Sequence, residues 1–453
     1  MVLGLIRENL RTLKIILAIT TMFAVSLIFT GCGKEKVIIL QPVIGPGPVS
    51  LAFPPVDAFI TTSNPTFYWN TLDGAVRYQL HVSQASDFIL KSINIETTDT
   101  TYTTLNPLEN STFFWRVRAI NSDSIWGDWS DADVWTFIKS DYQLYFNLVS
   151  QIYTRGVAQD LQVRDGTAYI ADGQSDLTII DVSNPASPQF VRNLDTQDDD
   201  FAQNVFIAEN DTFPYVYVAD NDRFVQLLIP DDTLFLYQQP LGGNQNTTDV
   251  GGIQIDSFLY VFYVSSTTGH RSLGYAPVYY GPHPQVGVTN ELFFPTSPYA
   301  LFVDGDYVYL AGGEGGLYIV NISQIEVDGT ITEISNLDLP GTSLKVFETN
   351  DIAYIASDRF GFYVINVADK ANPVLLTSIN TSGRTKDIHV VGNFAFIADA
   401  DGGLKAIDVT DPANAHFVAA YPTPYAYGVW ADANYIYICD RDYGLMIFEN
   451  LTQ

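Results

Sequence analysis

The sequence predicts an all-β protein in which a β-sandwich is followed by a seven-bladed β-propeller closed by an N-terminal strand. Three observations support this prediction. From residue 51 onward, short runs of alternating apolar and polar residues are separated by Gly, Asn, Asp and Pro, as in strands joined by tight turns. After residue 141, a unit of four such runs recurs. The last unit lacks a fourth run, whereas one unassigned run precedes the first unit.

The repeating unit is clearest between residues 155 and 196. Its first run alternates Leu161 and Val163 with polar residues, and a turn follows at Asp165 and Gly166. The second run surrounds Tyr169, and the third and fourth cover residues 177–182 and 190–194. Four strands within ~40–45 residues is the spacing of a propeller blade.

An aromatic residue in the second run of each unit allows the units to be counted. These residues are separated by 41 to 49 positions: Tyr169, Tyr217, Tyr260, Tyr309, Tyr354, Phe396 and Tyr437. The series predicts seven blades. Counting back from each aromatic residue gives the position that opens the innermost strand at the channel mouth: Asp160, Asn204, Gly251, Ala300, Lys345, Asp387 and Gly428. Such a mixed set suits an irregular partner better than a symmetric ion site.

The ends of the repeat region are out of phase with the repeat. Residues 145–149 resemble the fourth run of a unit, whereas the C-terminal unit stops after its third run at residues 445–448. We therefore expect the N-terminal strand to complete the last blade, because closing the ring removes exposed strand edges. The predicted propeller domain comprises residues 141–453.

The composition restricts the classes of partner. The 453 residues include 51 Asp and Glu but only 22 Lys and Arg, for a net charge of −29. An acidic surface of this kind repels phosphate groups, so the sequence predicts no binding to nucleic acid or to anionic lipid headgroups.

Residues 1–31 are predicted to be a signal peptide. Arg7, Arg11 and Lys14 precede an apolar run of ~14 residues, which is too short to span a bilayer comfortably. The sequence Phe-Thr-Gly before Cys32 resembles a bacterial lipobox. That resemblance implies cleavage before Cys32, diacylation of its thiol, and stable anchoring to a membrane of the bacterial cell envelope, with the outer membrane or cell surface favoured. The alternative is an uncleaved membrane anchor.

A tether and a second domain precede the repeats. Residues 32–50 contain alternating Pro and Gly, which favour an extended spacer. Residues 51–139 carry Pro54-Pro55, Trp69, the run 78–82, Leu105-Asn106-Pro107 and the run 115–119, and on these residues they resemble a fibronectin type III domain. Trp69, Trp115 and Val117 are expected to point inward. Arg116 and Arg118 are expected to stack on Trp126 and Trp129, either as a structural ladder or as a recognition patch.

The third runs of the propeller units resemble the LVIVD repeat of bacterial and archaeal surface proteins. Residues 177–181, 317–321, 362–366 and 404–408 carry the pattern, and Val-Ser-Asn-Pro or Val-Thr-Asp-Pro follows in units one and six. The match is good in units one, five and six, partial in four and seven, and poor in two and three. The resemblance implies a β-propeller at the cell surface and no particular activity.

Carboxylates concentrate in the turns between second and third runs, which share one face of the predicted disc. They include Asp172, Asp220, Asp399 and Asp440. Three interpretations compete. The carboxylates bond the backbone of their own turns; Asp198, Asp199 and Asp200, or Asp399 and Asp401, bind calcium; or a pair of carboxyls catalyses cleavage of a polysaccharide.

Aromatic residues suggest two further binding regions. Unit three departs most from the repeat and carries Tyr275, Tyr279, Tyr280 and His283, and unit seven places Tyr427 and Trp430 near the channel mouth. An aromatic loop on a rigid scaffold is a common binding surface. The alternative is that these aromatics are packed inside their own blades.

The sequence contains none of the catalytic motifs that we sought. The five His residues lack metal-ligand spacing, and Cys439 has no CxxC partner, so we expect it to be a small buried residue. We therefore predict a non-enzymatic, lipid-anchored protein that binds a protein or polysaccharide partner, with no cofactor except calcium in the interpretation above. The alternatives are a polysaccharide-acting hydrolase or lyase and a structural surface-layer component. The ligand, the membrane leaflet and the oligomeric state are not specified by the sequence.

Overall fold

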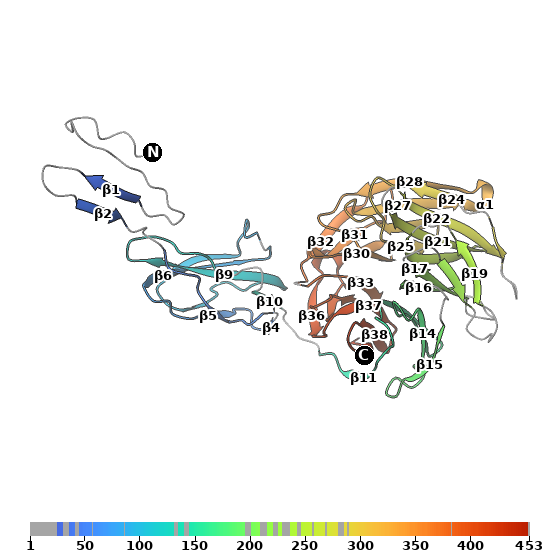
Figure 1. Cartoon of the computed structure of the whole chain (residues 1–453), viewed down its shortest axis with the longest axis horizontal. Helices are drawn as coiled ribbons and strands as arrows, with labels where there is room; N and C mark the ends of the chain where they lie inside the picture. Colours follow the sequence, from blue (N-terminus) through green and yellow to red (C-terminus); the bar gives the residue numbers. More distant parts are fainter. Residues whose placement is uncertain are drawn as a thin grey trace, which may run out of the picture. The chain divides into compact units, whose positions relative to one another are not determined.

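The computed structural model describes residues 25–29, 36–40 and 45–451, except for residues 57, 86, 131–134, 140–144, 195–200, 209–214, 221–224, 229–235, 242–245, 256–257, 268–269, 280–284, 288–289 and 382. The described chain is almost entirely β-strand (Figure 1). Strand β1 (Val25–Phe29) pairs antiparallel with β2 (Lys36–Leu40). The predicted lipidation site, Cys32, lies outside the described residues. Within those residues, no helix has the length and hydropathy needed to cross a membrane.

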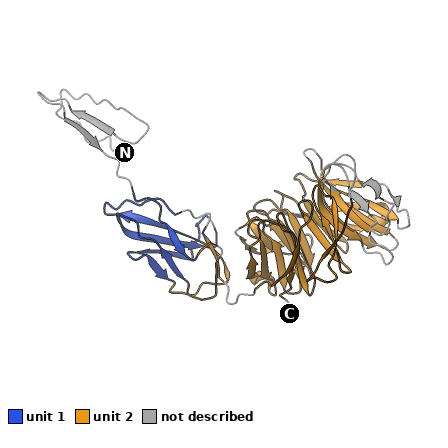
Figure 2. Ribbon diagram, turned by 60° about the horizontal axis from the view of Figure 1, so that its bottom comes forward, with its two compact units in different colours: residues 1–54, 66–103, 115–135 blue, residues 55–65, 104–114, 136–453 orange. Residues whose placement is uncertain are grey.

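The chain divides into two compact units (Figure 2). One unit contains residues 1–54, 66–103 and 115–135, and the other contains residues 55–65, 104–114 and 136–453. The second unit therefore includes all the repeats together with three segments of the region predicted as a sandwich, residues 55–65, 104–114 and 136–139.

Residues 51–139 form two sheets. The smaller sheet has the order β3 (Leu51–Phe53), β5 (Thr66–Trp69) and β8 (Thr101–Thr103). The larger has the order β4 (Ala58–Ile60), β10 (Thr136–Lys139), β9 (Ser111–Asn121), β6 (Ala75–Ser83) and β7 (Ile93–Thr97). Phe67 of the smaller sheet contacts Trp115 of the larger, with ring centroids 5.2 Å apart. Trp69, Trp115 and Val117 are buried, which confirms their predicted inward orientation.

Two arginines of β9 are stacked between aromatic rings. The guanidinium of Arg118 lies 4.5 Å from the ring of Trp126 and 4.4 Å from that of Trp129. The guanidinium of Arg116 lies 4.3 Å from Trp129 and 4.0 Å from Phe88. The five side chains therefore alternate as ring, cation, ring, cation, ring, and we call them the cation–π ladder.

The repeats form seven sheets within the residues that the structure describes, and we number them blades 1 to 7. Blade 1 contains β12 (Asp160–Arg164), β13 (Thr167–Ala171), β14 (Leu177–Asp181) and β15 (Gln189–Leu194). Blade 2 contains β16 (Ala202–Ala208), β17 (Tyr215–Asp220), β18 (Val225–Leu228) and β19 (Leu236–Leu241). Blade 3 contains β20 (Thr247–Ile255), β21 (Phe258–Thr267), β22 (His270–Tyr279), β23 (Gln285–Val286) and β24 (Asn290–Phe293).

The remaining blades continue this order. Blade 4 contains β25 (Ala300–Asp304), β26 (Tyr307–Ala311), β27 (Leu317–Gln324) and β28 (Thr330–Leu337), with the short helix α1 (Ile325–Asp328) before its last strand. Blade 5 contains β29 (Lys345–Thr349), β30 (Ile352–Ser357), β31 (Gly361–Asn366) and β32 (Val374–Ile379). Blade 6 contains β33 (Asp387–Val391), β34 (Phe394–Ala398), β35 (Leu404–Asp408) and β36 (His416–Tyr421). Blade 7 contains β37 (Ala426–Ala431), β38 (Tyr435–Asp440) and β39 (Gly444–Glu449).

The first strands of the seven blades lie next to one another in a closed series. Contacts run from β12 through β16, β20, β25, β29, β33 and β37 and back to β12. Strand β11 (Leu148–Ile152) pairs antiparallel with β39, with Ile152 opposite Leu445, so a strand that precedes blade 1 in sequence is the outermost strand of blade 7. This is the pairing that the sequence predicts.

The core of the repeats lies between neighbouring blades. Between blades 7 and 1, for example, Leu161 and Ile170 pack with Tyr437 and Cys439. Cys439 is fully buried, as predicted, and burial raises the pKa of its thiol well above the ordinary value. Alternating apolar residues thus serve two interfaces, one on each face of every sheet, which explains why nearly all second and third strands are buried.

Candidate functional site at the channel mouth

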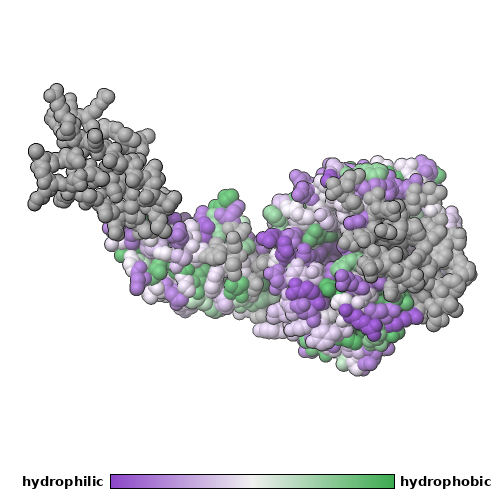
Figure 3. Space-filling model, viewed as in Figure 1, coloured by the Kyte–Doolittle hydropathy of each residue, from purple (hydrophilic) through white to green (hydrophobic). Residues whose placement is uncertain are grey.

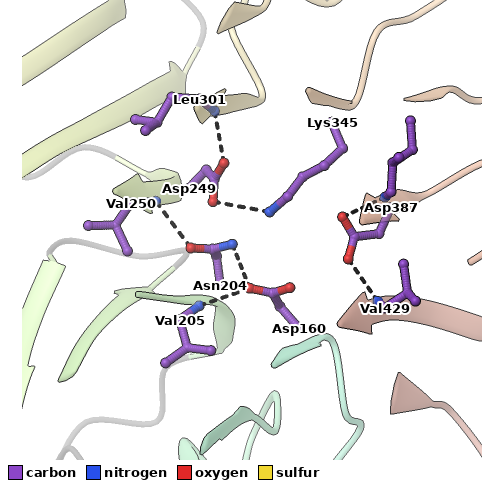
Figure 4. Close-up of polar contacts among 10 residues, drawn as sticks. Asp160, Asn204, Val205, Asp249, Val250, Leu301, Lys345, Asp387 and Val429 are labelled. Atoms are coloured by element: carbon purple, nitrogen blue, oxygen red, sulfur yellow. Dashed lines mark hydrogen bonds and ion pairs between the residues drawn. The ribbon is translucent and has the colours of Figure 1, made fainter. Parts of the chain in front are cut away.

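Five polar side chains meet where the inner strands begin (Figure 4). We call them the polar ring: Asp160, Asn204, Asp249, Lys345 and Asp387, from blades 1, 2, 3, 5 and 6. They line a cavity of about 170 Å³. The three carboxylates are at most 8% exposed.

Side-chain oxygens of the polar ring join neighbouring blades. In four places an oxygen accepts a hydrogen bond from a backbone N–H of the next blade's inner strand. The pairs are Asp160 Oδ2 with Val205 N at 3.1 Å, Asn204 Oδ1 with Val250 N at 3.2 Å, Asp249 Oδ2 with Leu301 N at 2.8 Å, and Asp387 Oδ2 with Val429 N at 2.8 Å. Asp or Asn at the start of an inner strand therefore satisfies a backbone donor that burial would otherwise leave unpaired.

Lys345 is the single cation of the polar ring. Its Nζ lies 3.4 Å from Oδ1 of Asp249, and Figure 4 shows it extending between Asp249 and Asp387. Burial raises the pKa of Asp249 to about 6 and that of Asp387 to about 7, although the Lys345 ammonium opposes both shifts. Burial also acts to lower the pKa of Lys345, but the surrounding carboxylates outweigh it and raise that pKa. Lys345 is therefore fully protonated, whereas Asp249 and Asp387 titrate near neutral pH.

An aromatic layer lies below the polar ring. The next inward residues on blades 4 to 7 are Phe302, Phe347, His389 and Trp430, and all four line the cavity. The rings follow one another at centroid distances of 4.8, 5.0 and 5.5 Å. Burial, helped by the nearby Lys345 charge, lowers the pKa of His389 to about 4, so its imidazole is neutral at pH 7. Trp430, a predicted binding residue, thus belongs to the channel wall.

Above the polar ring, the channel opens through a mouth lined by aromatic rings and cations. Tyr427 and Lys386, both half-buried, line it, as does Tyr299, which is 38% exposed. The ring of Tyr425 contacts that of Tyr427 in a tilted arrangement at 4.7 Å, and the guanidinium of Arg441 lies 4.9 Å from the ring of Tyr425. We call these five residues the mouth pad. The structure thus places Tyr427 at the channel mouth, as the sequence predicts.

Three carboxylates of the predicted rim do not face solvent. Asp172, Asp399 and Asp440 are fully buried. Asp172 Oδ2 accepts from the Gly156 N–H at 2.9 Å, and Asp440 Oδ2 accepts from the Tyr425 N–H at 2.9 Å. These carboxylates therefore fix the loops that precede the inner strands, which lie outside their own turns. Asp440 also bonds its own turn, because its Oδ1 accepts from the N–H groups of Asp442 and Tyr443. The three carboxylates are not available to a macromolecular partner.

The predicted calcium ligands are either in different environments or outside the described residues. Asp399 forms a buried ion pair with Lys405 at 2.8 Å, whereas Asp401 is exposed. Asp198, Asp199 and Asp200 lie outside the described residues, as does the side chain of Asp220. In the part of the chain that is described, no three His, Cys, Asp or Glu residues group closely enough to hold a metal ion.

The aromatic residues of blade 3 divide between core and surface. Tyr275 is buried, and its hydroxyl donates to the carbonyl of Gly329 in blade 4, so the prediction of an exposed binding residue is wrong there. The long strands β21 and β22 pack one face against the next blade, which explains the burial. Tyr279, at the end of β22, is 46% exposed and contacts Phe258 edge-on at 4.9 Å. Tyr280 and His283 lie outside the described residues.

Sequence reasoning missed part of the site. For blade 3 it placed Gly251 at the mouth, but the hairpin of β20 and β21 is longer than in other blades. Asp249 lies opposite Val264, so the aromatic residue from which to count back is Phe262 and not Tyr260. Phe347 and His389 were also missed. They lie two residues after Lys345 and Asp387 on strands with a two-residue side-chain period, and that spacing could have identified them.

Comparison with known proteins defines the class of the molecule as a β-propeller repeat protein. The WD40 repeats of RRP9 are similar at 9% identity, covering 67% of this chain and 97% of that one with a TM-score of 0.53. The WD40 β-propeller domain of Doa1 is similar at 10% identity, with the same coverages and a TM-score of 0.51. At such identities the likeness shows the fold alone. No protein with a curated description matches the sequence.

LVIVD repeats are present in five of the seven blades. Residues 155–196, 300–325, 342–381, 382–423 and 425–448 match the model of that repeat. The matches fall in blades 1, 4, 5, 6 and 7, and the two unmatched blades are those in which the sequence pattern is poor.

Proposed function

We propose that this protein is a non-enzymatic binding scaffold, a seven-bladed β-propeller closed by strand β11, whose channel mouth engages a protein or polysaccharide partner. The observation that carries the proposal is the mouth pad. Exposed Tyr and Arg side chains at a rigid rim are typical of binding surfaces, because they supply contact area at a small entropic cost. The β11–β39 pairing and the closed series of inner strands support the seven-bladed ring.

The charge distribution supports the mouth pad as the binding region. Cations are scarce in this chain, at 22 against 51 Asp and Glu, yet Lys386 and Arg441 both lie at the mouth. On the face shown in Figure 3, the described surface mixes hydrophilic and hydrophobic residues without one extended hydrophobic area. Arg441 is paired with Asp442 at 3.0 Å and Lys386 with Asp358 at 3.2 Å, so a partner with acidic groups would bind these cations by competing with carboxylates of the chain.

Substitutions at the mouth pad test this function. The purified full-length chain would be applied to glycan and peptide arrays, and affinity for any bound probe measured for Tyr427→Ala and Arg441→Ala. We expect each change to weaken binding at least tenfold. Lys370→Ala is the matched control, because Lys370 pairs with Asp351 in the turn after β29, at the opposite end of the channel. It should leave affinity unchanged.

Other results would point to other functions. Cleavage of a glycan probe would overturn the non-enzymatic proposal in favour of a polysaccharide-acting hydrolase or lyase. Absence of binding by a folded chain would favour a structural surface-layer component.

We also propose that Cys32 anchors the protein to the bacterial cell envelope and that residues 51–139 act as a fibronectin type III-like spacer. The support is the lipobox-like sequence before Cys32 and the Pro- and Gly-containing tether. Expression in a bacterium fed labelled palmitate tests the anchor. Label should enter the wild-type chain and not Cys32→Ser, which should leave the membrane fraction. Equal labelling of both would refute it.

A further inference from the structure

The cavity below the mouth pad carries more negative charge than the chain neutralises. Three carboxylates of the polar ring face one ammonium, and the ammonium of Lys345 is within ion-pair distance of Asp249 alone. Asp160 and Asp387 are 8% and 5% exposed, and neither has a cationic partner within 4 Å in the described part of the chain. Buried carboxylates are usually paired with a cation.

Asp160 and Asp387 retain capacity to accept further hydrogen bonds. Each carboxylate can accept about four. Asp387 accepts from the N–H groups of Ile388 and Val429, and Oδ2 of Asp160 accepts from Asn204 and Val205. Both carboxylates line the same cavity. A ligand with a positive charge and several N–H donors would balance the negative charge of these carboxylates and supply the hydrogen bonds that they can still accept.

The rest of the cavity suits a hydrocarbon chain. Phe302, Phe347 and Trp430 form its wall next to the polar ring, and His389 between them is neutral. The volume of about 170 Å³ equals the share of roughly six water molecules in the liquid, enough for an ammonium group and a short unbranched chain. Aromatic faces also stabilise a nearby cation.

We propose that this cavity is a binding site for a primary alkylammonium group, held by Asp160 and Asp387 beside Lys345, with its carbon chain against Phe347 and Trp430. A primary ammonium has three N–H donors for the carboxylates, whereas a quaternary ammonium has none. An anion would be repelled, because three carboxylates face one ammonium in the polar ring. The group belongs either to a free amine or to a lysine that a macromolecular partner inserts through the mouth.

Isothermal titration calorimetry on the full-length chain at pH 8 tests the site with three probes. They are n-butylammonium, Nα-acetyl-lysine methylamide and tetramethylammonium. We expect n-butylammonium to bind at least tenfold more tightly than tetramethylammonium. Repeating the titration in two buffers of different ionisation enthalpy should reveal proton release, because a bound cation favours the ionised carboxylates. If the lysine derivative binds as tightly as n-butylammonium, the source is a partner's lysine; if only n-butylammonium binds, the source is a free amine.

Two variants assign the binding to the cavity. Asp387→Asn keeps an oxygen for the Val429 N–H but removes one charge, and should weaken n-butylammonium binding at least tenfold. Phe347→Leu keeps the apolar volume and should weaken it about threefold. Asp401→Asn, an exposed carboxylate away from the cavity, is the control and should change nothing.

The inferred amine site and the proposed binding of a macromolecule at the mouth can be tested separately. Tyr427→Ala should weaken binding of a partner found on the arrays but leave the affinity for n-butylammonium unchanged. Absence of n-butylammonium binding at millimolar concentration, or equal affinity in folded Asp387→Asn, would overturn the inference whatever the arrays show.

Discussion

The cation–π ladder of residues 51–139 and the polar ring of the propeller hold cations in opposite ways. In the ladder, Arg116 and Arg118 lie between aromatic rings, which carry no titratable charge. In the ring, Lys345 lies among carboxylates whose pKa values burial has raised toward neutrality. The ladder therefore keeps its charge balance at any physiological pH, whereas the ring exchanges protons in that range. The comparison shows that the partners of a buried cation decide whether its site responds to pH.

Removing the cation should have the largest effect in the ring. Lys345→Met would leave three buried carboxylates without an ammonium, and breaking a buried pair in this way destabilises by roughly 3–5 kcal/mol. Urea unfolding at pH 8 should show this loss in the free energy of unfolding. The loss should be smaller at pH 5, because the carboxyls take up protons. Lys386→Met, at the exposed mouth, is the control. Equal losses at both pH values would contradict this account of the ring.

The pH dependence of stability should have opposite signs in the two regions. Asp249 and Asp387 have folded-state pKa values of about 6 and 7, above the ordinary value, so the folded state binds more protons between pH 4 and 7. The contribution of these two carboxyls to the free energy of unfolding therefore decreases as pH rises through this window, by a few kcal/mol in total. His389, whose pKa is lowered, offsets part of this decrease. Asp387→Asn should flatten the slope measured by urea unfolding. An unchanged slope would exclude Asp387 as a source.

Next to the ladder, His81 should give the reverse slope. Burial first, and then the charges of Arg116, Lys91 and Arg118, lower its pKa to about 4. The unfolded state therefore binds more protons between pH 4 and 6.5, and the contribution of His81 to stability increases with pH there. His81→Asn should remove this contribution, of the order of 1–3 kcal/mol for a side chain that is 6% exposed. Hydrogen exchange of β6 and β9 amides at pH 4.5 and 7 would measure it.

The smallest effect is expected for the ladder cations themselves. Arg118→Gln would remove two cation–π contacts, at ~0.5–1 kcal/mol each, and should do so equally at about pH 7 and pH 8.5, where His81 is neutral. Arg77→Gln on neighbouring β6 is the control, because Arg77 forms an exposed pair with Glu96 at 3.0 Å and should contribute less than about 0.5 kcal/mol. A pH-dependent loss in Arg118→Gln would break the comparison.

Much of the architecture follows from local patterns in the sequence. The recurring aromatic residue and the missing last strand predicted the repeated sheets and the pairing of β11 with β39. Counting back from the aromatic residue located Asp160, Lys345 and Asp387, because blades 1, 5 and 6 keep the same register there, whereas Asn204 required an insertion before Tyr217. Asp249 escaped the count because the hairpin of β20 and β21 is longer, which makes Phe262 and not Tyr260 the equivalent aromatic residue.

The errors share one physical cause, which is that sequence pattern does not give side-chain direction in irregular segments. Asp172, Asp399 and Asp440 stand in turns that predict exposure, yet each points back to bond buried groups. Tyr275 stands in an aromatic run whose inward face depends on how blade 3 meets blade 4. Such contacts depend on the assembled ring and not on neighbours in the chain.

The hydrogen bonds between inner strands are not distributed evenly around the ring. Acceptors at Asp160, Asn204 and Asp249 join blades 1 to 4, and Asp387 joins blades 6 and 7, whereas Ala300, Lys345 and Gly428 offer no carboxylate or amide oxygen to the blade that follows. Blade 5 therefore lies between two linked arcs and lacks this kind of link between inner strands on either side. It is joined to blade 4 by the backbone pair of Gly313 with Ser343, and to blade 6 by the ion pair of Asp358 with Lys386 at 3.2 Å. The two joints of the lysine-bearing blade thus rest on connecting loops and not on the inner strands.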